Sequence, residues 1–530
     1  MSGTDDHCCV LAVDLGTSGC KTAIVSRAGE ILGWAYRAVD TRFLPGDGAE
    51  QVPEDWWQAF LGSAGEALAR SGVAARHIVA VCCSTQGEGT IPVDREGLAL
   101  SNAITWMDMR GSEQIRQQSR GRLNMAGYDA FKLWRWLRLC GGAPALSGKD
   151  PSAHMLYIRE HMPEVYACTY RFLNVLDYLN LRLTGRFVAT HDSILTSWVT
   201  DNRDAGKVRY HPGLVADSGI DADKFPEIVP CTEVLGPLLP AVAEALGLDP
   251  TTRVVAGAID NTAAAVGAGT LADYAPHLYI GTSSWIGAHV PRKQTHVRSA
   301  IASLPCAVPD KYLMVAMQTT AGSNLAFLKE KVLYHQDELL REAQLPDVYK
   351  IIDQIAARVP AGSKGLIYTP WLFGERCPVE DRSLRAGLFN LSLHHSRETI
   401  IRAFLEGVAL NTRWMMKPVE RFLGRPVREM TILGGGGSSE VWCQIFADVL
   451  GVPMRQLAEP LQANAVGAAY IAFVGLGLID YPSAAAQTRY RRVFEPHAAH
   501  HGVYGERYAT FVELYERLQP LYQRLSHAQG

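Results

Sequence analysis

The segment DLGTSGCK, which starts at Asp14 directly after an apolar stretch, combines a carboxylate, small residues, hydroxyls and a lysine. Gly16 lets a phosphate approach the backbone, and the hydroxyls of Thr17 and Ser18 can donate hydrogen bonds to it. Lys21 supplies positive charge, and Asp14 is suited to hold a hydrated Mg²⁺. The segment is therefore a candidate phosphate and magnesium site, and the alternative is an ordinary hairpin turn.

A second candidate is the segment GAIDNTAAAVG, in which Asp260 and Asn261 stand where an apolar strand meets a helix of small residues. Asp260 can serve as the N-cap of that helix and nothing more. It can equally act as a general base that takes a proton from an attacking hydroxyl. The local sequence leaves both interpretations open.

Two further glycine-rich turns follow strands in the second half of the chain. Gly281 and Thr282 belong to a GTS turn that can contact phosphate, and four glycines at 434–437 precede a predicted helix at 441–450. Gly435 and Gly436 allow close approach of a flat ring beside a helix N-terminus. The sequence contains no G-x-x-x-x-G-K-[ST], G-x-S-x-G or H-E-x-x-H motif, so neither a P-loop protein nor a hydrolase or zinc protease is indicated.

The elements that must position these residues read as a duplicated α/β pattern. Strands are predicted at 8–13, at 21–26 and from 31, joined by tight turns as an antiparallel meander, with a helix at 53–68 and a buried strand at 78–83. Strand, GTS turn and strand return at 277–290, followed by strands at 312–317 and 430–433. We expect two domains of one type, joined near residues 270–277. An aromatic stripe at three- or four-residue intervals, from Tyr504 to Tyr522, predicts a C-terminal helix that clasps the second domain.

Composition excludes several other classes of protein. The 530 residues are 48% hydrophobic and 20% charged, with a formal net charge of -3, which argues against a broad nucleic-acid surface. No apolar run is long enough to cross a membrane, and the start of the chain does not resemble a secretory signal. The eleven cysteines include no C-x-x-C pair and are expected to be reduced thiols. A cytoplasmic location is predicted.

Taken together, these segments resemble the FGGY family of carbohydrate kinases, within the actin and hexokinase superfamily. The resemblance runs along almost the whole chain. It rests on DLGTSGCK, EQVPEDWWQAF, STQGEG, ITWMDMRG, FKLWRWL, FLNVLDYLNLRLTG, GAIDNTAAAVGAG, YIGTSSW, TAGSNLAFL, the stretch from WLFGERCPVED to EGVALN, and LGGGGSSEVWCQIFADVLGVPM.

The resemblance implies two ribonuclease-H-like domains with the active site between them. Residues 1–272 would bind the sugar and carry the base, and residues 273–530 would bind the nucleotide. ATP and Mg²⁺ are the implied cofactors. Asp260 would be the general base and Asn261 would help to bind the sugar. The remaining implied contacts are Asp14 with Mg²⁺, Gly16, Thr17, Ser18 and Lys21 near the transferred phosphate, Gly281 and Thr282 with the nucleotide phosphates, and Gly322, Gly435 and Gly436 beside the adenosine.

Within the family the chain is most similar to the xylulokinase subgroup, which implies D-xylulose or a related ketopentose as substrate. Gly87 and Glu88 depart from that pattern, because they stand where a methionine and a histidine are usual, and Ile259 stands where glycine is common. The residues that can contact the sugar are Gln86, Glu88, Trp106, Asp108 and Arg110. Arg110 can instead pair with Asp108, and Trp106 can instead fill core.

Two other functions stay open at this point. One is a kinase for another sugar or polyol, such as a tetritol, glycerol or ribulose. The other is an ATP-binding sugar sensor without catalysis, which the presence of both Asp14 and Asp260 disfavours, because a pure binding protein has no use for a base. A small-molecule sugar is the expected partner, with neither nucleic acid nor membrane. Homodimers are common in this family, but one sequence demonstrates no interface.

Overall fold

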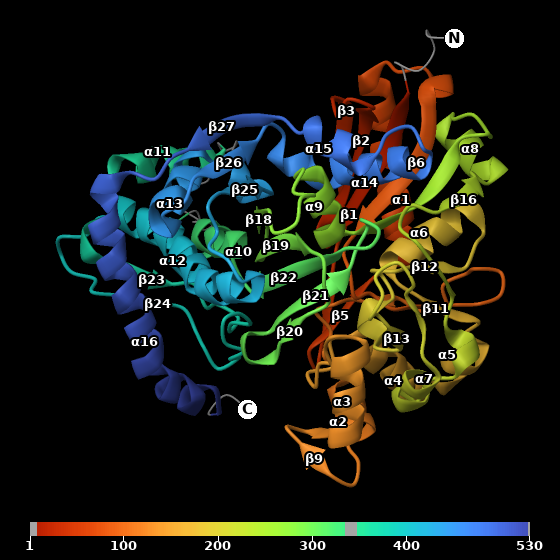
Figure 1. Cartoon of the computed structure of the whole chain (residues 1–530), viewed down its shortest axis with the longest axis horizontal. Helices are drawn as coiled ribbons and strands as arrows, with labels where there is room; N and C mark the ends of the chain where they lie inside the picture. The colour runs from red at the N-terminus through yellow and green to blue at the C-terminus, as the bar shows by residue number, and fades with distance from the viewer. Residues whose placement is uncertain (1–7, 334–346, 528–530) are drawn as a thin grey trace, which may run out of the picture.

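The computed structural model describes residues 8–333 and 347–527 and contains two large mixed sheets (Figure 1). The first sheet has six strands, in the order β16 (Val234–Pro237), β17 (Arg253–Ile259), β6 (Ile78–Thr85), β1 (Cys9–Gly16), β2 (Gly19–Ser26) and β3 (Ile31–Ala38). The predicted meander is confirmed, because β1–β2 and β2–β3 pair antiparallel while β6 lies parallel to both β1 and β17.

The second sheet repeats this order and adds two strands at one edge. Its strands run β20 (Thr295–His296), β21 (Ile301–Pro305), β22 (Tyr312–Gln318), β19 (Ser284–Val290), β18 (Pro276–Ile280), β25 (Met430–Leu433), β26 (Met454–Leu457) and β27 (Tyr490–Phe494). As in the first sheet, an antiparallel meander (β18, β19, β22) is followed by two parallel strands (β25, β26) and a final antiparallel strand. The predicted duplication is thus present in the topology.

Helices cover both faces of the first sheet. Helix α1 (Pro53–Ser71) starts on a proline, ends at Gly72 in the left-handed conformation, and packs on β2 and β3. Helix α6 (Val175–Thr184) packs against β6 and β17 on the same core. The opposite face is covered by α9 (Asp260–Gly267) and α14 (Ala463–Gly475), although α14 comes from the second half of the chain.

The two helices α9 and α14 cross at very close range. A Cβ atom on Gly267 would lie 1.8 Å from the Ala463 carbonyl oxygen, and one on Gly467 would lie 1.9 Å from that of Ala263. Only glycine leaves room for such an approach of two backbones. The crossing fixes the two sheets relative to each other, since α9 directly follows β17 of the first sheet and α14 follows β26 of the second after a short turn.

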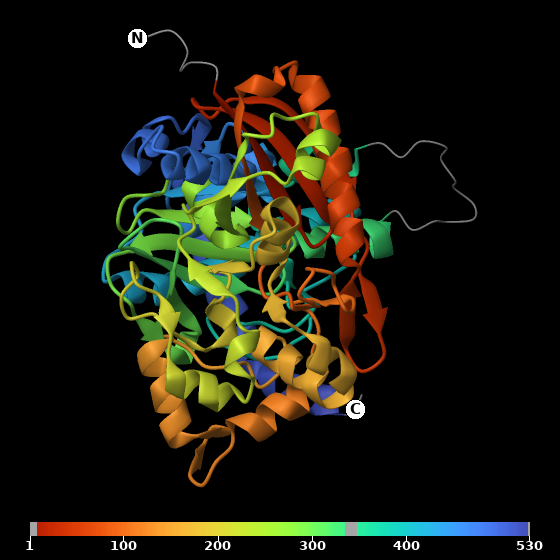
Figure 2. The ribbon, with the colours of Figure 1, turned by 90° about the vertical axis from the view of Figure 1, so that its right-hand side faces the viewer.

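A smaller lobe is inserted between β6 and β17, and lies below the first sheet in Figures 1 and 2. It contains α2 (Ser112–Ser119), α3 (Ala130–Leu139), α4 (Pro151–His161), α5 (Pro163–Cys168), α7 (Pro212–Ser218) and short strands that include β12 (Val188–Thr190). In the second half, α11 (Val348–Arg358), α12 (Arg397–Leu423) and α13 (Glu440–Leu450) form the main helical cover.

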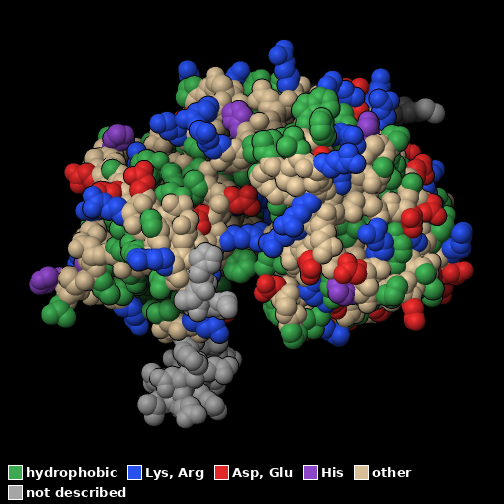
Figure 3. All heavy atoms as spheres, turned by 90° about the horizontal axis from the view of Figure 1, so that it is seen from below, with side chains coloured by type: hydrophobic (Ala, Val, Ile, Leu, Met, Phe, Trp, Pro, Cys, Tyr) green, Lys and Arg blue, Asp and Glu red, His purple; other side chains and the backbone are tan. Residues whose placement is uncertain are grey.

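The C-terminal helix α16 (His501–His527) packs on α12, α13 and β23 (Ile367–Thr369), as the predicted clasp requires. Phe511 and Tyr504 of its aromatic stripe are fully buried in the core of the second half. Seen from below, the molecule is hollowed between its two lobes (Figure 3). No helix among the described residues is long and apolar enough to cross a membrane.

Candidate active site

The first hairpin places an acid and a base on neighbouring strands. Asp14 and Lys21 are register partners on β1 and β2, and Lys21 Nζ lies 2.9 Å from Asp14 Oδ2. The other oxygen, Asp14 Oδ1, accepts a hydrogen bond of 3.2 Å from the side chain of Asn464 on α14. The Asp14 carboxylate raises the pKa of the Lys21 ammonium, so this lysine stays charged. Asn464 had no local signal in the sequence.

The turn at the tip of this hairpin is tied to two residues predicted to contact substrate. Thr17 Oγ1 donates to Gln86 Oε1 at 2.9 Å and accepts from the indole Nε1 of Trp106 at 3.0 Å. Gln51, which the sequence did not single out, donates to the Thr17 carbonyl oxygen at 2.7 Å and accepts from Gln86 Nε2 at 2.7 Å. Thr17, Gln86 and Trp106 therefore meet in one network.

Asp260 is held in place by the buried carboxylate of Asp192, from the loop after β12. Asp192 Oδ2 accepts the backbone N–H of Ile259 at 3.0 Å and also the hydroxyl of Thr262. Asp260 is the first residue of α9 and Ile259 occupies its N-cap position, without a side-chain capping bond, so Asp260 is not the N-cap and Asp192 holds this first turn from outside the helix. The Asp260 side chain is left to accept the N–H of Asn261 at 2.7 Å.

The surroundings of Asp260 suit a proton acceptor. Burial raises the pKa of the Asp260 carboxyl to about 7, and the nearby carboxylates of Asp14 and Glu88 act in the same direction. A base with a pKa near neutral accepts a proton efficiently at physiological pH. The structure thus brings Asp14, Lys21 and Asp260 into one electrostatic environment. Tyr279, at the end of β18, belongs to it too, because Lys21, Asp14 and Asp260 all act on the pKa of its hydroxyl, which burial raises to about 12.

Two residues that depart from the family pattern, Gly87 and Ile259, lie next to each other. A Cβ atom on Gly87 would lie 3.7 Å from the Cδ1 atom of Ile259, so the small residue at 87 faces the large residue at 259. Glu88 follows with a φ of 60°, in the left-handed region that few side chains adopt. Glu88 also acts on the inserted lobe. Burial raises the pKa of the Asp150 carboxyl there to about 6, and the negative charge of Glu88 acts in the same direction.

Asp108 and Arg110 form a separate cluster. Asp108 is 1% exposed and accepts hydrogen bonds from the backbone of Ala49 at 2.8 Å and from Arg110 Nε at 2.9 Å. Arg110 also pairs with Glu50 at 2.6 Å. Arg110 therefore pairs with Asp108, which was the alternative to a sugar contact. Sugar contacts by Asp108 and Arg110 stay predictions.

The glycine turns of the second half lie together. Gly322 N–H donates to the Gly281 carbonyl oxygen at 2.8 Å, and Thr282 O accepts from the backbone of Ser323 at 3.2 Å. A Cβ atom on Gly436 would collide with the side chain of Ile280, the neighbour of Gly281, while one on Gly435 would lie 3.8 Å from Leu461. The GTS turn, Gly322 and the tetraglycine segment thus lie close to one another. Their contacts with a nucleotide stay predictions.

Glu375 is a buried carboxylate that supports this side of the site. It accepts hydrogen bonds from the backbone N–H groups of Thr319 and Arg376, at 3.0 and 2.7 Å, and from Asn411 at 2.6 Å. Burial raises the pKa of Glu375 to about 7. Because Thr319 belongs to the short segment that joins β22 to Gly322, Glu375 is a positioning group for that segment, and nothing in the sequence pattern had indicated this role.

Comparisons with known proteins agree with this architecture. Family models described as the N-terminal and C-terminal domains of the FGGY family of carbohydrate kinases match residues 9–267 and 278–476. The chain is 28% identical to a xylulose kinase of Bacillus subtilis over 514 residues, which cover 96% of each protein. It is 25% identical to a gluconokinase of the same organism over 477 residues, covering 89% of this chain and 88% of the relative.

Solved structures point the same way. The crystal structure of xylulose kinase from Rhodospirillum rubrum has a TM-score of 0.80 and 26% identity, and the match covers 97% of this chain and 100% of that one. The two family models together span most of the chain, and the fold agrees over 97% of it. The chain therefore belongs to the FGGY family of carbohydrate kinases and is a sugar kinase.

Proposed function

We propose that the protein transfers the terminal phosphate of ATP to a hydroxyl of a neutral sugar, D-xylulose or a related ketopentose. The observation that carries the proposal is Asp260, which begins α9, has a carboxyl pKa of about 7 and feels the charge of Asp14, the partner of Lys21. Asp260 takes the proton of the acceptor hydroxyl as its oxygen bonds to the γ-phosphorus. The bond from that phosphorus to the bridging oxygen breaks, and ADP leaves.

Mg²⁺ fits the charges of this site. Asp14, Asp260 and Glu88 place three carboxylates near one another, and Lys21 is paired with only one of them. Divalent magnesium prefers such carboxylates together with phosphate oxygens. Asp14 would hold the ion, which would neutralise charge on the phosphates. Lys21 and the backbone at Gly16 to Ser18 would orient the transferred group from the first half, and the glycine turns of the second half would hold the nucleotide.

The charge of Glu88 supports a neutral acceptor over an acidic one. A carboxylate beside the proposed base repels a second carboxylate, such as that of gluconate, and accepts hydrogen bonds from sugar hydroxyls. The same residue favours one second candidate, a kinase for another neutral polyol or sugar. Gly87 and Ile259 stand where the usual subgroup has other residues, so the shape of the proposed sugar site differs at this point. A substrate with a different arrangement of hydroxyls could fit there.

A coupled assay for ADP release tests both candidates. With Mg-ATP, D-xylulose, D-ribulose, erythritol, glycerol and gluconate are compared with a reaction without sugar. We expect turnover with a ketopentose at least about tenfold above that with gluconate, since a repelled charge at close range costs more than 1.4 kcal/mol. Preference for erythritol or glycerol would select the second candidate. Absence of stimulation by every compound would contradict the kinase proposal itself.

A further inference from the structure

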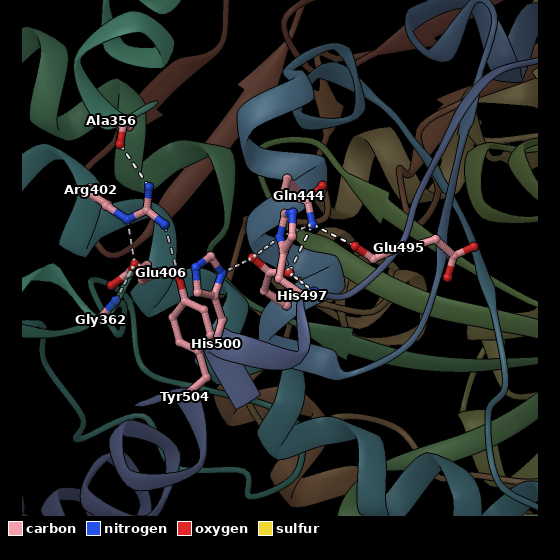
Figure 4. Close-up of polar contacts among 10 residues, drawn as sticks. Ala356, Gly362, Arg402, Glu406, Gln444, Glu495, His497, His500 and Tyr504 are labelled. Atoms are coloured by element: carbon pink, nitrogen blue, oxygen red, sulfur yellow. Dashed lines mark hydrogen bonds and ion pairs between the residues drawn. The ribbon is translucent and has the colours of Figure 1, made fainter. Parts of the chain in front are cut away.

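A cluster of two histidines and one aspartate lies in the second half, among the helices that pack on α16. Asp448 belongs to α13, His497 follows β27, and His500 ends the short 3-10 turn Ala498–His500 that leads into α16. One potential ligand atom from each residue lies within 4.8 Å of the other two, in the only such group of three found among the described residues. Figure 4 shows His497 and His500 converging beside Gln444.

The ligand atoms of the cluster lie at hydrogen-bond distances from one another. His497 Nδ1 lies 3.1 and 3.2 Å from the two oxygens of Asp448, and His500 Nδ1 lies 2.7 Å from Asp448 Oδ2. Both imidazoles therefore turn the same nitrogen towards one carboxylate. Ligand atoms bound to one tetrahedral Zn²⁺ at about 2.0–2.2 Å are about 3.3 Å apart, so small movements would admit the ion.

The carboxylate is pre-oriented by groups outside the ligand set. The side chain of Asp448 is only 2% exposed. Gln444, one helical turn earlier on α13, donates to Asp448 Oδ1 at 2.9 Å and to the Glu495 carbonyl oxygen at 2.9 Å. The backbone N–H of His497 adds a bond of 2.8 Å to the same carboxylate oxygen. Such outer contacts fix the orientation of a metal-binding carboxylate.

The two histidines are accessible from solvent, with side-chain exposures of 55% for His497 and 35% for His500. An ion can therefore enter, and water can complete its coordination. Two imidazole nitrogens, one carboxylate oxygen and an open position form a ligand set typical of Zn²⁺.

We propose that Asp448, His497 and His500 bind Zn²⁺ and that the ion fastens the start of α16 to α13. The His500 ring meets Tyr504 edge-on, with centroids 6.2 Å apart. Tyr504 in turn donates to Glu406 at 2.8 Å, in a buried ion pair with Arg402 (Figure 4). The ion thus extends a network that already anchors α16. This proposal is independent of the sugar and of the catalytic residues.

Calorimetric titration of untagged, chelator-treated protein with Zn²⁺ tests the site, with visible absorption of bound Co²⁺ as a second readout. We expect one ion per chain and a melting temperature that rises with Zn²⁺ concentration. His497→Gln, at an exposed side chain that can be changed without unfolding, should weaken binding at least tenfold, as should His500→Ala. His501→Ala, at the neighbouring histidine outside the cluster, should bind like the wild type.

Asp14→Asn separates this site from the proposed magnesium site. Zn²⁺ binding that survives Asp14→Asn but is lost in His497→Gln supports the proposal. Equal binding by His497→Gln, His500→Ala and His501→Ala, or no stoichiometric binding by the wild type, would overturn it and leave the cluster as a hydrogen-bonded clasp.

Discussion

The two halves of the molecule share one strand order but place different side chains at equivalent points. In the first hairpin the cross-strand pair is Asp14 and Lys21, an ion pair of 2.9 Å. In the second hairpin the equivalent pair is Tyr279 and Trp285, which stack with ring centroids 3.9 Å apart and planes 7° from parallel. One scaffold thus carries charge in one copy and a flat apolar surface in the other.

The strand-to-helix junctions differ in the same way. In the first half β17 leads directly into α9, with Asp260 at its first turn. In the second half β26 is followed by Glu459 and a short turn before α14 starts at Ala463. The duplication supplies two frames that meet at the Gly267–Gly467 crossing, and they carry different side chains at equivalent points. We therefore propose that the chemistry belongs to the first half and nucleotide binding to the second.

The sharpest test of this division changes the acidic residue at each junction. Asp260→Ala should lower kcat by roughly 10²- to 10⁴-fold, because the proton acceptor is lost, while nucleotide binding measured by calorimetry stays within about twofold. Glu459→Ala, at an exposed acid of the second junction, is the matched control and should keep near-normal kcat. Near-normal turnover by Asp260→Ala would remove the proposed base.

The next largest effect is expected on stability, at the crossing of α9 and α14, where Gly267 and Gly467 make equivalent contacts. Gly267→Ala places a methyl group 1.8 Å from the Ala463 carbonyl oxygen, and Gly467→Ala does the reciprocal. Each should lower the free energy of unfolding by about 3 kcal/mol, the cost of overpacking a close contact. Chemical denaturation measures the change. The control is Gly65→Ala, on an exposed face of α1 with nothing within 4 Å.

A stability change at Gly267 and none at Gly467 would mean that the two helices do not contribute equivalently to the crossing. If both variants matched Gly65→Ala, which should be neutral or stabilising by up to about 1 kcal/mol, the tight contact itself would be wrong.

The smallest effect concerns pH. Asp260 accepts a proton only when it is ionised, and its raised pKa of about 7 means that activity should fall as pH decreases below about 7. Glu88→Gln removes a nearby negative charge, so the pKa of Asp260 decreases and the acid limb of kcat/KM should move to lower pH. Glu96→Gln, at an exposed carboxylate, should leave the limb in place.

The titration of ATP itself is the same in assays of all three proteins, so it does not affect the comparison of their pH profiles. An identical acid limb in wild type and Glu88→Gln would show that Glu88 does not act on the base.

Local patterns were sufficient to predict the two hairpins and helix α1. The meander follows from short apolar runs separated by tight turns, and helix α1 from Pro53 and the spacing of its apolar residues. Those signals lie within a few residues of one another, as do the motif residues Thr17 and Asp260.

The supporting contacts could not be predicted because they join segments far apart in the chain. Asp192 binds the backbone N–H of Ile259 from 67 residues earlier in the chain, and Asn464 reaches Asp14 across 450 residues. Neither residue differs in its local sequence from an ordinary loop or helix residue. Asp260 was ambiguous for the same reason, since only the fold shows that α9 begins at Asp260, with Ile259 at the N-cap position and Asp192 holding the turn.

The closeness of Gly87 and Ile259 has an evolutionary consequence. A Cβ atom added at 87 would lie 3.7 Å from the Ile259 side chain, in ordinary van der Waals contact with it. The effect of a substitution at either position is therefore expected to depend on the residue at the other, so the two positions are expected to show epistasis.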